Sequence, residues 1–119
     1  MSLEFYKIMH IIGFVSIFAS LGGLWGLSLK GAGPKERRAM ALVHGVGMTL
    51  VLISGFGMLA RLGLTAAMPG WIYGKLGIWL VLGGSMVLAK RKAHLGPMLI
   101  VGWVLIGGLA AFFAVMKPF

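Results

Sequence analysis

Residues 8–29 read IMHIIGFVSIFASLGGLWGLSL, a run that contains no Asp, Glu, Lys or Arg. An α-helix needs about 20 apolar residues to cross a hydrocarbon core of about 30 Å, and this run is long enough. Inside a bilayer the backbone can satisfy its polar groups only as a helix or a closed barrel. The run is therefore predicted to form a transmembrane helix.

Three further stretches of the 119-residue chain have the same character, although one of them contains the single charge of Lys75. The four predicted spans cover about residues 6–29, 38–60, 71–89 and 95–116. Hydrophobic residues make up 60% of the chain and charged residues only 11%, which is too few charges for a water-facing globular surface. We expect an all-α fold: one integral-membrane four-helix bundle that forms a single domain, residues 1–119.

Positive charges gather in two of the predicted loops, after the first and third spans. The loop cations are Lys30, Lys35, Arg37, Arg38, Lys90, Arg91 and Lys92, against Lys7, Arg61 and Lys117 on the other side. The positive-inside rule then predicts an N-out/C-out, multi-pass protein of the inner (cytoplasmic) membrane. The net charge of +9 is thereby assigned to membrane edges in contact with lipid, and a nucleic-acid partner is not expected.

Three ionisable residues lie within the predicted spans: His10, His44 and Lys75. Such residues are costly in hydrocarbon and mark a functional site by default. Folding the first two spans against each other brings His10 roughly opposite Phe56 and His44 opposite Gly22. At about 1.5 Å per residue the two imidazoles differ in depth by roughly 20 Å. They are therefore not expected to ligate one metal ion within a single chain.

The chain also has 20 glycines, and small residues such as Gly13 and Gly55 fall near the level of His10 and Lys75. They predict either tight helix packing or room for a flat ligand. Because imidazole ligates iron in b-type haem sites, we predict His10 as a metal ligand and His44 as a second candidate. Lys75 is predicted to contact a haem propionate or a substrate. The alternatives are a structural hydrogen bond for His44 and a snorkelling side chain for Lys75.

Three short stretches resemble a known family. They are YKIMHII at 6–12, ERR at 36–38 and GWIYGKL at 70–76. They resemble the first three helices of the HemJ-type protoporphyrinogen oxidases, and they are similar also to the SirB-type and CopD-like small membrane proteins. The resemblance implies a b-type haem held by the histidine matched by His10, an important lysine matched by Lys75, and self-association into a homo-oligomer.

The chain departs from that family where Ser85-Met86 stands in place of a Tyr–His pair. We therefore predict a membrane b-type haem protein, a cytochrome-like electron-transfer or redox subunit with haem b and a quinone or redox partner. One alternative is protoporphyrinogen oxidation, a haem-dependent oxidoreductase activity in which Lys75 would be catalytic. The other is a cofactor-free small transporter or structural subunit. The absence of Cys excludes thiolate metal sites and disulfides.

Overall fold

Four long helices form nearly the whole of the chain, which confirms the all-α four-helix prediction. The computed structural model describes residues 2–64 and 66–116, so Lys117 lies outside the described residues. The elements are α1 (Leu3–Leu29), α2 (Pro34–Leu62), α3 (Gly70–Arg91), the short 3-10 helix η1 (Ala93–Leu95) and α4 (Met98–Met116). All four long helices are long and apolar enough to cross a membrane.

Local sequence signals explain where the helices begin and end. The Ser2 hydroxyl accepts a hydrogen bond from the Phe5 backbone N–H at 3.2 Å, which caps the start of α1. Pro34 occupies the first turn of α2, where its missing N–H costs nothing. Gly63 ends α2 with a φ of 73°, and Gly96 adopts a φ of 75° after η1. Because of that turn, the fourth helix begins at Met98 rather than at residue 95.

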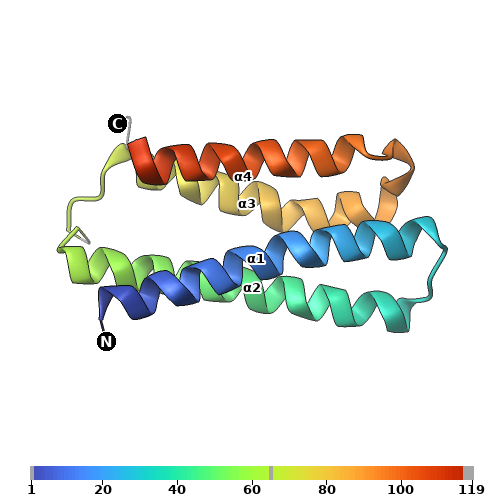
Figure 1. The fold of residues 1–119 in the computed structure, drawn as a ribbon, viewed down its shortest axis with the longest axis horizontal. Coiled ribbons are helices and arrows are strands. Elements are labelled where there is room, and N and C mark those ends of the chain that lie inside the picture. The colour runs from blue at the N-terminus through green and yellow to red at the C-terminus, as the bar shows by residue number, and fades with distance from the viewer. Residues whose placement is uncertain (1, 65, 117–119) are drawn as a thin grey trace.

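The helices lie roughly side by side in a flattened bundle of 47 × 27 × 18 Å. In Figure 1 the α1–α2 and α3–α4 connections are at one end, while both termini and the α2–α3 connection are at the other. Both basic loops of the sequence therefore lie at the same end of the bundle, as the charge pattern predicts.

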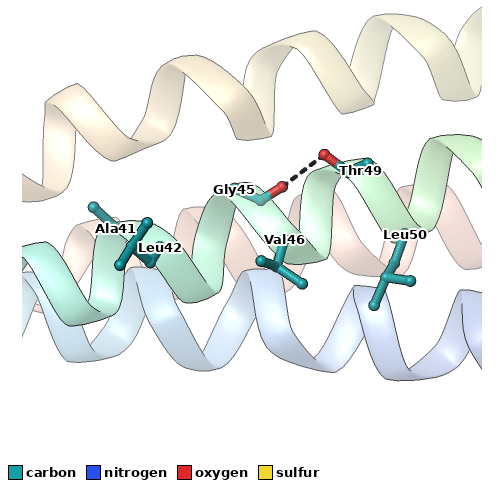
Figure 2. A pocket seen from close by; sticks show the side chains of 6 residues that line it. All are labelled: Ala41, Leu42, Gly45, Val46, Thr49 and Leu50. Atoms are coloured by element: carbon teal, nitrogen blue, oxygen red, sulfur yellow. Dashed lines mark hydrogen bonds between the residues drawn. The ribbon is translucent and has the colours of Figure 1, made fainter.

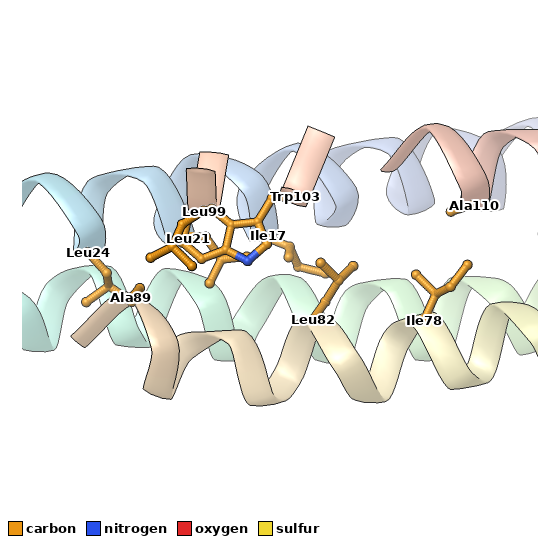
Figure 3. Packing of buried hydrophobic residues seen from close by; sticks show 9 residues of the cluster. All are labelled: Ile17, Leu21, Leu24, Ile78, Leu82, Ala89, Leu99, Trp103 and Ala110. Atoms are coloured by element: carbon orange, nitrogen blue, oxygen red, sulfur yellow. The ribbon is translucent and has the colours of Figure 1, made fainter. Parts of the chain in front are cut away.

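The buried apolar core is built by three of the four helices. Figure 3 shows its side chains: Ile17, Leu21 and Leu24 of α1, Ile78, Leu82 and Ala89 of α3, and Leu99, Trp103 and Ala110 of α4. Elsewhere every helix exposes large apolar residues, including Leu42 of α2, Leu80 of α3 and Leu105 of α4, which are 64%, 66% and 68% exposed. Apolar surface of this extent requires lipid around it, and the protein is a multi-pass membrane protein.

Helix α2 is attached through an unusually close contact with α1. A Cβ atom added to Gly13 would lie 2.9 Å from the Gly47 carbonyl oxygen, and one added to Gly47 would lie 2.8 Å from the Gly13 oxygen. The two backbones approach each other because neither residue has a side chain, as in small-residue helix crossings in membranes. This crossing fixes the register of α1 against α2.

The close contact predicts a specific sensitivity. Gly47→Ala should destabilise the bundle by about 1–3 kcal/mol, because the added methyl group forces the two backbones apart. Gly45→Ala is the matched control, since a Cβ there meets nothing within 4 Å. Unfolding of the detergent-solubilised protein, followed by helical circular dichroism, measures both variants. Equal stability of the two would contradict the assignment of this crossing.

Candidate functional site

His10 of α1 lies against the small-residue surface of α2 at the end of the bundle that holds the termini. Its Nδ1 atom is 3.0 Å from the hydroxyl oxygen of Ser54. A Cβ added to Gly55 would lie 3.5 Å from the His10 ring, so the imidazole packs over that glycine. The side chain is half-buried. The sequence prediction that His10 and Gly55 lie at one level agrees with this contact.

The hydrogen bonds around Ser54 favour one tautomer of His10. The single hydroxyl proton of Ser54 is donated to the Leu50 carbonyl at 2.5 Å, with the Val51 carbonyl at 3.2 Å. When that proton is donated to one of these carbonyls, Ser54 accepts a hydrogen bond from His10, and Nδ1 is then the protonated nitrogen that donates. In that tautomer the neutral ring carries its lone pair on Nε2, and the ring also interacts with the backbone of Val51. This is the tautomer in which a histidine ligates a metal through Nε2 while Nδ1–H is held by a neighbour.

Lys75 lies in the same half of the bundle. It is the charged residue that interacts electrostatically with the His10 ring, and its side chain is half-buried on α3. No hydrogen bond to Lys75 is formed by the described residues. The structure thus brings the predicted lysine close to the predicted histidine, although they come from different helices.

His44 has a different environment, because it turns toward α3. It is 3% exposed, and its Nε2–H donates to the Leu82 backbone carbonyl at 3.1 Å. In the opposite direction, Trp79 of α3 donates its Nε1–H to the Met48 carbonyl of α2 at 3.0 Å. These reciprocal bonds tie α2 to α3 and account for a buried imidazole without any ligand.

The expectation that His44 lies opposite Gly22 of α1 is wrong, because the imidazole turns toward α3. A Cβ added to Gly22 meets nothing within 4 Å, and one added to Gly23 meets only Met40. Several other glycines are likewise covered by this chain's own side chains: Tyr6 over Gly57, Phe113 over Gly74 and Phe18 over Gly107. Gly13 is in contact with the backbone of α2. These glycines therefore serve close packing, whereas others, such as Gly22 and Gly108, have open space beside them.

Two shallow grooves mark the outer surface, and neither contains a candidate residue. One, of about 500 Å³, follows α2 and is lined by Ala41, Leu42, Gly45, Val46, Thr49 and Leu50 (Figure 2). The other, of about 450 Å³, lies between α1 and α4 and is lined by apolar and aromatic side chains that include Phe14, Phe18 and Trp103. Within the described residues no group of three or more His or Glu side chains could hold a metal ion. His94 is exposed in η1.

Comparison with protein families, with curated proteins and with solved structures finds no match for this chain. The resemblance to the HemJ-type proteins is therefore neither supported nor opposed, and the case for a function rests on the geometry around His10. Ser54 is the residue of this site that sequence reasoning missed. Its signal was its place one residue before Gly55, at the depth of His10.

The environment of His44 predicts a structural role. His44→Leu keeps most of the volume but removes the bond to Leu82, and it should cost roughly 1 kcal/mol of unfolding free energy. His94→Ala is the control, since that imidazole is exposed and should leave stability unchanged within about 0.5 kcal/mol. Unfolding in detergent followed by circular dichroism compares the two. A His44→Leu protein as stable as His94→Ala would remove the structural assignment.

Proposed function

We propose that the chain is a small membrane protein that binds b-type haem through Nε2 of His10. The observation that carries the proposal is the hydrogen bond from His10 Nδ1 to Ser54. With the proton on Nδ1, this bond orients the ring and leaves the lone pair on Nε2, the nitrogen that we propose ligates the iron. When bound, haem supplies one-electron redox chemistry, which fits an electron-transfer or redox subunit.

Lys75 supports the same site. A haem carries two propionate carboxylates, and a lysine close to the ligating histidine provides a cation to pair with one of them. A lysine within a membrane span needs such a partner or a path to the interface, because hydrocarbon does not solvate its charge. We propose that Lys75 binds a propionate rather than acting on a substrate.

The proposal has one haem site per chain. His44 is excluded from it, because its ring is buried and its Nε2–H is used by Leu82. Side chains cover Gly57, Gly74 and Gly107, so the cofactor would lie at the side of the bundle where His10 is half-exposed. A second axial ligand would then come from outside this chain, for example from another copy in a homo-oligomer. Oxidation of protoporphyrinogen rests on the family resemblance alone and stays a prediction.

Spectra of the purified protein and three variants test the proposal. The protein expressed with ample haem should show a Soret band and, after reduction, α and β bands. His10→Ala should lose them, and Ser54→Ala should bind haem about 10- to 100-fold more weakly, because the ligand loses its orienting partner.

His44→Leu is the matched control, since it removes an intramembrane imidazole without touching the site. It should keep the full spectrum. A colourless wild-type protein would overturn the proposal in favour of a cofactor-free membrane subunit. If His44→Leu lost haem and His10→Ala kept it, the iron ligand would be His44, and the proposal for His10 would be overturned.

A further inference from the structure

The end of the bundle opposite the termini is strongly basic. The α1–α2 connection with the first turns of α2 and the end of α3 contribute Lys30, Lys35, Arg37, Arg38, Lys90, Arg91 and Lys92. Glu36 is the sole acidic residue of these segments. In the other half, the cations of the described residues are Lys7 and Arg61 near the membrane edge and Lys75 within α3, and Glu4 lies in the first turn of α1. The charge is therefore concentrated at one membrane edge.

A hydrogen bond holds the two basic segments next to each other. Trp25, near the end of α1, donates its Nε1–H to the Ala93 carbonyl of η1 at 3.2 Å. Ala93 is buried in this contact. Because η1 directly follows the cations of α3, the bond keeps them beside the α1–α2 turn. This contact opposes the electrostatic repulsion between the cations of the two segments. Their positive potentials therefore add up at this end of the bundle.

Two buried polar atoms at this end have no partner among the described residues. They are Nε of Arg37 and the hydroxyl oxygen of Ser28. Gly23 lies against Met40, so Ser28 comes level with the first turn of α2, which contains Arg37. A buried polar group without a hydrogen bond costs free energy. Both residues are half-buried, and a change of side-chain rotamer would bring these covered atoms to an acceptor from outside the chain.

We propose that this basic end binds the phosphate of an anionic phospholipid, with Arg37 and Ser28 as its inner contacts. An arginine presents Nε and a terminal nitrogen as a fork that matches two phosphate oxygens, and a serine hydroxyl can donate to a third. A lipid is favoured over free phosphate because exposed apolar side chains, Leu29, Leu95 and Met98, border the cations. They offer acyl chains a surface next to the headgroup site.

Native mass spectrometry of the full chain in detergent tests this, with phosphatidylglycerol, phosphatidylcholine and inorganic phosphate as probes. Phosphatidylglycerol should bind the most tightly. Arg37→Gln should weaken its binding at least about fivefold, the effect of one cation near an anionic lipid surface. Arg37→Lys, which keeps the charge but loses the fork, should recover only part of the affinity. Ser28→Ala should also weaken phosphatidylglycerol binding. Of these three substitutions it is the smallest change in side-chain volume, so it should disturb the fold least.

Arg61→Gln is the matched control, because it removes an exposed arginine from the opposite end of α2. It should change phosphatidylglycerol binding by less than about twofold, as expected for a charge outside the site. Equal losses in Arg37→Gln and Arg61→Gln would show diffuse attraction and overturn the proposal. The proposal would also be overturned if phosphatidylcholine bound as tightly as phosphatidylglycerol. Inorganic phosphate that displaces the lipid at equal concentration would identify a free-anion site instead.

Discussion

Hydrocarbon provides no water to a polar group, so each donor within these spans must find its acceptor inside the protein. Most hydroxyl side chains meet this demand within their own helix, as Ser85 does by donating to the Val81 carbonyl at 2.8 Å. The ring N–H groups of His44, Trp79 and Trp25 reach carbonyls of other segments and join them. His10 differs because its bond ends on a side chain whose own proton is already donated. In our proposal Ser54 therefore holds Nδ1–H of His10, and Nε2 is the nitrogen that ligates the iron.

The site at His10 depends on packing that lies several turns away. The contact between Gly13 and Gly47 brings the backbones of α1 and α2 together and sets their register, which in turn puts Ser54 beside the His10 ring. Helix α3 supplies Lys75 and is tied to α2 by the His44–Leu82 bond. The buried histidine therefore contributes to the stability of the bundle and lies outside the site at His10. The apolar core of α1, α3 and α4 provides the framework on which α2 is mounted.

Hydrophobic run lengths and loop charges were sufficient to predict four helices and a shared basic end, since both follow from the bilayer thickness and from charge alone. The depth of His10 was also predictable, since its ring packs over Gly55, and Lys75 is near enough to interact with the ring electrostatically. The rotation of each helix about its axis was not predictable, because the lipid-facing and inward-facing sides of each helix are equally apolar. For that reason the turn of His44 toward Leu82 and the covering of glycines by aromatic rings were missed. The contact between Ser54 and His10 was also not predictable, because the two residues are far apart in the sequence and form no recognisable motif.

The tautomers of the two intramembrane histidines test the account most directly. Nitrogen-15 NMR of the haem-free protein, labelled at histidine and assigned with His10→Ala and His44→Leu, distinguishes a protonated from a bare ring nitrogen. The account predicts a proton on Nδ1 of His10 and a bare Nε2, with the opposite arrangement in His44. Added haem should shift the Nε2 signal of His10 and leave that of His44 unchanged. A protonated Nε2 in His10, with Nδ1 bare, would contradict the account, because the ligating lone pair would then point at Ser54.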